Sequence, residues 1–130
     1  MQDAYRDGVL SINHRSDAFM EISKKAINGI REKLNVPKGY TIYFLTSATE
    51  CWEVIAESFV QKESIHIYNG AFGDKWCTYT EKLVPNVMRK PFDREAQLQE
   101  DQLRFTKGDL ICITQNETSN GTQVGTDGIK

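Results

Sequence analysis

Short β-prone runs alternate with helical patterns along this chain, and that alternation limits its possible folds more than any other feature. The chain is organised around residues 41–60, where the β-branched and aromatic run 41–45 (TIYFL) is followed at once by apolar residues at helical spacing. The turn signal NVPKG at 35–39 marks the beginning of the run. The run predicts a buried strand, and the spacing predicts a helix directly behind it.

The same two patterns recur on either side of this segment. They predict, in order, a helix capped at Ser16 or Asp17 and ending near Leu34, the strand 41–45, a helix capped at Thr49, a strand at 65–69, a helix at 72–83, a short strand at 87–89, a weaker helix at 95–103 and a strand at 109–114. Alternation of this kind indicates an α/β fold with a mostly parallel sheet and helices on both faces.

Three loops follow strands at the end where parallel sheets bind ligands. Loops 46–49, 69–73 and 115–121 are therefore expected to share one pocket. The first brings small hydroxyl residues to a helix start, with Thr49 as the N-cap and Glu50 in the first turn. The N–H groups and the positive dipole end at such a start suit a phosphate. The alternative is a plain strand–helix turn whose small residues only cap the helix.

The composition excludes several classes of protein. With 39% hydrophobic and 26% charged residues over 130 positions, the chain can form a core. Its net charge of −2, with Lys and Arg spread along the sequence, offers no basic surface for nucleic acid. It contains no apolar run of membrane-spanning length and no signal-peptide core at its N-terminus, so we expect no membrane partner and a cytoplasmic location.

Cysteine and histidine do not form a metal-binding pattern. Cys51, Cys77 and Cys112 lie within apolar patterns and lack CxxC spacing, so they are predicted to be reduced, buried thiols. His66 lies inside a strand pattern and is predicted to be an ordinary sheet residue. The polar run 116–128 has no further core-forming pattern, and we expect the chain to be part of a larger domain that covers this edge.

Five short motifs point to one family by their order. They are INHRS (12–16), LNVP (34–37), TSATE (46–50), NGAFG (69–73) and QNETSNG (115–121). Together they resemble the front half of the large domain of the class V (fold type I) pyridoxal-phosphate aminotransferases, over residues 9–128. The His-Arg pair before the first long helix and the Asn-Glu-Thr after the last strand are most similar to those of phosphoserine aminotransferases.

The resemblance implies a pyridoxal 5′-phosphate site in the three loops. The cofactor phosphate would be held by the backbone amides of Ala48, Thr49 and Glu50. Phe72 would stack on the pyridine ring, at a position where the family usually has tryptophan. The hydroxyl of Thr118 would hydrogen-bond the cofactor, whereas the neighbouring Glu117 is expected to accept from backbone donors of the glycine loop.

The resemblance also implies a substrate clamp, with two departures from the family. His14 and Arg15 would hold the substrate carboxylate or phosphate, often across a dimer interface. The phosphate loop, however, has Glu50 in place of a glycine-rich sequence with an arginine, and a carboxylate facing the pocket would repel a phosphorylated substrate. The family's Schiff-base lysine, its aspartate at the pyridine nitrogen and its C-terminal small domain would all lie beyond Lys130.

The family's reaction follows from the resemblance alone. A phosphoserine aminotransferase converts glutamate and 3-phosphohydroxypyruvate to 2-oxoglutarate and phosphoserine, in serine biosynthesis, as a homodimer. Residues 1–130 would be a fragment of its cofactor-binding domain and inactive alone, with no catalytic residue of their own. The alternatives are another class V enzyme, such as an alanine–glyoxylate-type aminotransferase or a cysteine desulfurase, and a non-catalytic α/β binding module.

Overall fold

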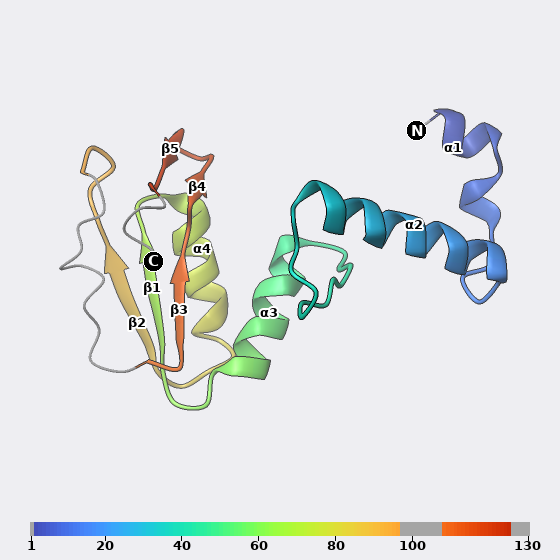
Figure 1. The fold of residues 1–130 in the computed structure, drawn as a ribbon. Helices are drawn as coiled ribbons and strands as arrows, with labels where there is room; N and C mark the ends of the chain where they lie inside the picture. The colour runs from blue at the N-terminus through green and yellow to red at the C-terminus, as the bar shows by residue number, and fades with distance from the viewer. Residues whose placement is uncertain (1, 97–107, 126–130) are drawn as a thin grey trace. The chain divides into compact units, whose positions relative to one another are not determined.

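The computed structural model describes residues 2–96 and 108–125, and the chain divides into two units, Met1–Phe44 and Leu45–Lys130. Figure 1 shows their helices and strands. The predicted helix 95–103 lies almost wholly outside the described residues.

The first unit is helical. It contains α1 (Gln2–Arg6), the short 3-10 helix η1 (Val9–Ser11) and α2 (Asp17–Lys33). The Ser16 hydroxyl accepts a hydrogen bond from the amide of Phe19 at 3.2 Å, which confirms Ser16 as the predicted N-cap of α2. No residue of α2 is buried, although its apolar stripe follows the predicted spacing.

The predicted strand 41–45 is wrong. These residues have no regular secondary structure, and the side chains of Tyr43 and Phe44 are 81% and 62% exposed. A strand is stable only when its backbone groups pair with a neighbouring strand, and among the described residues no strand pairs with this run. The β-prone composition is therefore present without the partner that would make it a strand.

The second unit is built on a three-stranded parallel sheet. Its strands are β1 (Ser64–Tyr68), β2 (Val87–Pro91) and β3 (Leu110–Ile113), in the order β2-β1-β3, with both pairings parallel (Figure 1). This confirms the predicted α/β class and parallel sheet. The other three predicted strands match to within two residues at each end.

The central strand carries the core of the second unit. All five residues of β1 are buried, and the strand has neighbours on both edges. His66 is paired in register with Arg89 and Cys112, and its ring meets the ring of Trp76 edge-on, with centroids 5.5 Å apart. The buried apolar side chains of the described residues are Ala56, Ile65, Ile67, Tyr68, Cys77, Val84, Cys112 and Val124.

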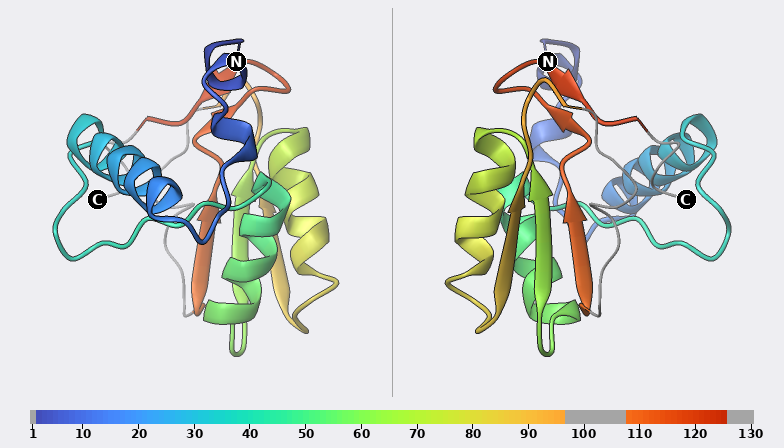
Figure 2. Two further views of the ribbon diagram at one scale, coloured as in Figure 1. Left: turned by 90° about the vertical axis from the view of Figure 1, so that its right-hand side faces the viewer. Right: turned by 90° about the vertical axis from the view of Figure 1, so that its left-hand side faces the viewer.

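Two helices of this unit lie on the same face of the sheet. Helix α4 (Ala71–Thr80) packs against β1 and β2, and α3 (Ala48–Phe59) packs against α4, as both views of Figure 2 show. Since β1, α4 and β2 follow one another in the chain, they form one strand–helix–strand crossover. Because β1 and β3 are also parallel neighbours, the loops that follow them leave the sheet at the same rim.

The segment after β3 folds, contrary to the prediction that it lacks a core-forming element. Strands β4 (Asn116–Glu117) and β5 (Thr122–Gln123) form an antiparallel hairpin. Gly121 takes a positive φ of 74° in its turn, and Val124 is only 7% exposed. The side-chain amide of Asn120 also donates to the backbone carbonyl of Asn69 at 2.9 Å. Polar hydrogen bonds, rather than an apolar pattern, fix this hairpin.

Candidate functional site

A cavity of about 270 Å³ lies where the three loops meet. Its lining residues are Ala48, Trp52, Phe72, Trp76, Thr114, Asn116 and Thr118. Each of the three predicted loops contributes at least one residue, which confirms that they share one pocket. The volume is close to the lower end of the range for ligand pockets and suits one small ring.

Aromatic rings form one wall of this cavity. Trp52 of α3 and Trp76 of α4 stack with centroids 5.9 Å apart and planes 15° apart. Phe72, one turn before Trp76, is 47% exposed, so its ring retains an accessible surface. A flat ligand ring gains both apolar contact and stacking beside such rings.

The start of α3 contributes backbone donors. The Ser47 hydroxyl accepts from the amide of Glu50 at 3.1 Å, so Ser47 is the N-cap, not Thr49 as predicted. The Glu50 amide is thereby already bonded. Among the described residues, the amides of Ala48 and Thr49 have no hydrogen-bond acceptor, as expected for the first turn of a helix. These two amides and the helix dipole can bind an anion.

The Glu50 carboxylate turns back over the loop. It accepts from the backbone amide and the hydroxyl of Thr46, at 2.7 and 2.5 Å, and it does not line the cavity. The hydrogen bonds from Thr46 lower the pKa of Glu50, so this carboxylate is charged at neutral pH. The expected repulsion of a phosphate is lessened by this orientation, although the negative charge remains near the helix start.

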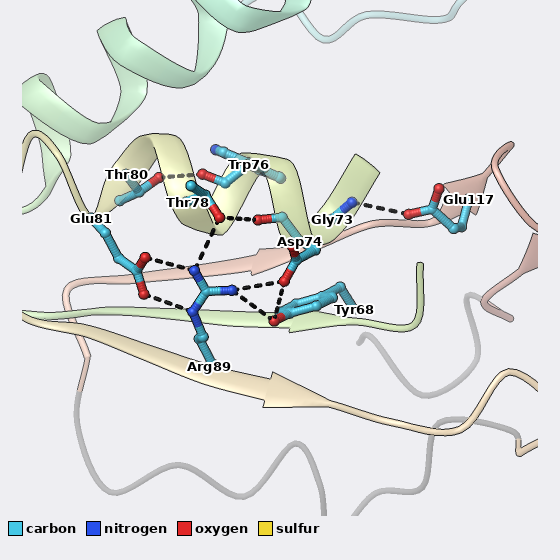
Figure 3. A network of polar contacts seen from close by, with 9 residues as sticks. All are labelled: Tyr68, Gly73, Asp74, Trp76, Thr78, Thr80, Glu81, Arg89 and Glu117. Atoms are coloured by element: carbon cyan, nitrogen blue, oxygen red, sulfur yellow. Dashed lines mark hydrogen bonds and ion pairs between the residues drawn. The ribbon is translucent and has the colours of Figure 1, made fainter. Parts of the chain in front are cut away.

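The start of α4 is capped by the side chain of Glu117, which belongs to the β4–β5 hairpin. The buried carboxylate of Glu117 accepts from the amide of Gly73 at 3.0 Å (Figure 3). It also accepts from the amide of Phe72 at 3.3 Å. This confirms that Glu117 satisfies backbone donors of the glycine loop. Burial alone would raise the pKa of Glu117, but the hydrogen bonds it accepts, the one from Ser119 first, lower the pKa below its ordinary value. An incoming anion therefore finds free amides at α3 and not at α4.

Four lining residues were not predicted as site residues: Trp52, Trp76, Thr114 and Asn116. Their spacing does contain a signal, since Ala48 and Trp52 are four residues apart on one helix, as are Phe72 and Trp76 on the next. Thr114, Asn116 and Thr118 alternate, which places them on one side of an extended segment.

The predicted substrate residues lie in the other unit. His14 and Arg15 are exposed in the turn before α2, where the Arg15 amide donates to the side-chain oxygen of Asn13 at 2.9 Å. Within this unit, no described contact connects the side chain of His14 or Arg15 with a ligand site. Their role stays a prediction.

The thiols and the buried histidine take no part in the cavity. All three cysteines are free, and burial raises the pKa of Cys77 to about 11 and of Cys112 to about 12, which keeps both as thiols. Cys51 is only partly buried. In residues 2–96 and 108–125, no group of three or more His, Cys, Asp or Glu side chains is placed to hold a metal ion. None of the helices described here is long and apolar enough to cross a membrane.

The chain is similar in sequence to known phosphoserine aminotransferases. No family model matches the chain. It is 32% identical over 128 residues to a phosphoserine aminotransferase from Lactococcus lactis subsp. cremoris (strain MG1363), and the match covers 89% of this chain and 35% of that protein. A phosphoserine aminotransferase from Corynebacterium glutamicum is 27% identical over 118 residues, covering 89% of this chain and 31% of its own length.

A solved structure agrees with these relatives. The crystal structure of a phosphoserine aminotransferase from Cytophaga hutchinsonii superposes with a TM-score of 0.90 at 30% identity, over 98% of this chain and 36% of that one. The chain is thus similar in sequence and fold to part of the phosphoserine aminotransferases. It spans about 35% of the length of the curated relatives that it matches first.

Proposed function

We propose that this chain is part of the cofactor-binding domain of a pyridoxal-phosphate-dependent aminotransferase that makes phosphoserine. The observation that carries the proposal is the single cavity lined by Ala48, Phe72 and Thr118, the residues to which the family resemblance assigns cofactor phosphate, ring and hydroxyl contacts. The similarity to phosphoserine aminotransferases supports the choice of reaction.

The residues of the cavity fit the cofactor chemically. The amides of Ala48 and Thr49, without an acceptor among the described residues, suit a phosphate at the positive end of α3. Glu50 is assigned only a supporting part, because its amide is bonded to Ser47. The ring of Phe72 offers a face to a pyridine ring, and Thr118 offers a hydroxyl that donates or accepts.

Each group of the cavity would have a separate task. The α3 amides would bind the anionic end of the ligand, while Phe72 and Thr118 would orient its ring. The stacked pair Trp52 and Trp76 would keep water from the inner side of the ring. When bound, pyridoxal phosphate supplies the electron-withdrawing ring on which amino transfer depends.

Ligand binding to the chain tests the site. The probe is 4′-deoxypyridoxine 5′-phosphate, which lacks the aldehyde and cannot react with surface lysines. Because the two tryptophans of the chain both line the cavity, binding should quench their fluorescence. The phosphorylated probe should bind at least about tenfold more tightly than 4′-deoxypyridoxine, since hydrogen bonds to a charged group contribute about 1.5 kcal/mol or more. Equal affinities for the two compounds would contradict the proposal.

The whole protein's activity is a further part of the proposal. A longer form that includes the regions matching the rest of the relatives should convert glutamate and 3-phosphohydroxypyruvate to 2-oxoglutarate and phosphoserine, as a cytoplasmic homodimer in which His14 and Arg15 bind the substrate. The 130-residue chain alone should not. Turnover by the chain alone, or no turnover by the longer form, would contradict this assignment.

A further inference from the structure

Glu117 joins the two loops that carry Phe72 and Thr118. It is the second residue of β4, its side chain is 1% exposed, and it does not itself line the cavity. Its neighbours on both sides, Asn116 and Thr118, do line the cavity. A buried carboxylate in this position needs a reason, because the charge is costly to bury unless it is well hydrogen-bonded.

The carboxylate bonds to both loops at once. Oε1 accepts from the Phe72 amide at 3.3 Å and from the amide and hydroxyl of Ser119, at 3.2 and 2.5 Å. Oε2 accepts from the Gly73 amide at 3.0 Å. The Ser119 hydroxyl in turn accepts from the Ala71 amide at 3.0 Å. The backbone on either side of the cavity is therefore held through one side chain.

Gly70 permits this close approach. A Cβ at position 70 would overlap the Cγ of Glu117 and would lie 2.8 Å from the hydroxyl of Ser119. Any larger residue would push the carboxylate and the serine away from the start of α4. The glycine and the glutamate are thus complementary parts of one contact between segments more than 40 residues apart in sequence.

An ordinary helix cap would not need this arrangement. A cap is usually supplied by the residue next to the helix, as Ser47 does for α3. Gly70, at the start of α4, has no side chain for that purpose, and the cap comes from the hairpin instead. The same bonds that cap α4 consequently fix the Phe72 backbone relative to Thr118.

We propose that Glu117 is a positioning residue for the ring of the cavity ligand, acting through the backbone of Phe72 and Ser119. It keeps the Phe72 ring and the Thr118 hydroxyl at the spacing that a bound ring requires. The inference rests on the proposed function, because the ligand is the one assigned to this cavity above. It concerns the ring side of the ligand only, since the amides of Ala48 and Thr49 belong to α3 and do not contact Glu117.

The test compares Glu117→Gln with Glu81→Gln. A glutamine keeps the size of the side chain, but its NH₂ cannot accept from a backbone N–H. Either the bond from Gly73 or the bonds from the Phe72 and Ser119 amides are therefore lost. Glu81 is a matched control at the other end of the same helix, where its carboxylate bonds to Arg89. We expect Glu117→Gln to weaken binding of 4′-deoxypyridoxine 5′-phosphate about tenfold, a loss typical of one misplaced hydrogen-bonded contact. Glu81→Gln should leave this binding unchanged.

Inorganic phosphate separates positioning from general loss of structure. Its binding, followed by the amide NMR shifts of Ala48 and Thr49, should be the same in Glu117→Gln and in wild type, because only the ring side is disturbed. Amide hydrogen exchange without ligand should be faster at 71–73 and at 118–120 in this variant. Ser119→Ala, a milder change that removes one donor to Glu117, should show a smaller effect in the same direction.

The outcomes distinguish this inference from the proposed function. Equal loss of phosphate and ring-ligand binding in Glu117→Gln would mean a structural role and overturn the inference. Unchanged ring-ligand binding in both Glu117→Gln and Ser119→Ala would overturn it as well, while leaving the cavity assignment intact. A wild-type chain that binds neither ligand would overturn the proposed function and this inference together.

Discussion

The guanidinium of Arg89 forms two hydrogen bonds to the carboxylate of Glu81, from Nε to Oε1 at 2.7 Å and from Nη2 to Oε2 at 2.6 Å (Figure 3). Its third nitrogen, Nη1, donates to Asp74 at 2.7 Å and to the hydroxyl of Tyr68 at 3.1 Å. Arg89 of β2 therefore bonds both to the first turn of α4, at Asp74, and to its C-cap, Glu81. Bidentate pairs of this geometry are stronger than single surface ion pairs.

Replacing Arg89 by alanine should consequently destabilise the second unit. The expected loss is about 1–2 kcal/mol, below the value for a fully buried charged network, because the arginine side chain is 34% exposed and solvent screens the charges. Urea unfolding followed by tryptophan fluorescence measures it. Arg6→Ala is the control, since the pair of Arg6 with Asp3 is 76% and 83% exposed and its removal should leave the urea midpoint unchanged. Equal midpoints for both variants would contradict this role of Arg89.

His66 should make stability depend on pH in a defined window. Burial first, and then the charge of Arg89, lower the pKa of His66 to about 4, while Glu81 opposes the shift. The unfolded chain takes up this proton near pH 6.5, so between 6.5 and 4 protonation favours unfolding. Stability should be complete above pH 6.5 and should fall by about 2 kcal/mol as the pH is lowered to about 5.

Urea unfolding at several pH values measures this loss. His66→Gln should be less stable at neutral pH but should show a much flatter profile between about pH 6.5 and 5. His14→Gln, which changes the chain's other histidine, should keep the wild-type profile. Four carboxylates have a lowered pKa: Glu50, Glu81, Asp109 and Glu117. Their stabilising contribution is present at neutral pH and is lost mainly below this window, as the pH falls below their ordinary pKa values. A wild-type profile without a slope in this window would contradict the role of His66.

The sequence predicted elements well where burial is decided locally. The run 64–68 is apolar at alternate positions and buried along its whole length, so its pattern was sufficient. The run 41–45 has an equally strong β pattern but no pairing partner among the described residues, and β-propensity measures how a residue fits a sheet rather than whether a sheet is there.

The sequence predicted which loops form the candidate site, but its local patterns did not predict the hydrogen bonds that hold those loops in place. The rule for parallel sheets placed Phe72 and Thr118 at one rim, and the cavity agrees. Ala48 lines the same cavity although the strand predicted before it is absent. The true cap of α3 was missed because Ser47 and Thr49 are both good N-cap residues, and local preference does not choose between them. Glu117 reaches donors 44 and 45 residues away, and the position of its carboxylate depends on how the hairpin folds. No local pattern contains that information.

Gly73 should be intolerant of even one methyl group. A Cβ there would overlap the Cβ of Tyr68 and lie 2.9 Å from the hydroxyl of Thr114, and the Tyr68 atom cannot move without its backbone. Gly73→Ala should cost about 1–3 kcal/mol. Gly29→Ala in the middle of α2 is the matched control, because a Cβ there meets nothing within 4 Å. It should increase helix stability by about 0.5–1 kcal/mol. Urea unfolding and circular dichroism measure both changes, and a neutral Gly73→Ala would contradict the close packing of α4 on β1.

The ring of Phe72 should contribute directly to ligand affinity. Its face is accessible beside the cavity, and stacking an aromatic ring on a heterocycle contributes about 1–3 kcal/mol. Phe72→Ala should therefore weaken binding of 4′-deoxypyridoxine 5′-phosphate by about tenfold or more, whereas Phe72→Trp should keep or improve it, because indole offers a larger face. Calorimetry is the measurement, since the second variant adds a fluorophore. Phe59→Ala is the control: this phenylalanine lies at the other end of α3, is 63% exposed and does not line the cavity. If Phe72→Ala and Phe59→Ala bound the ligand equally well, Phe72 would be a helix residue without a part in binding.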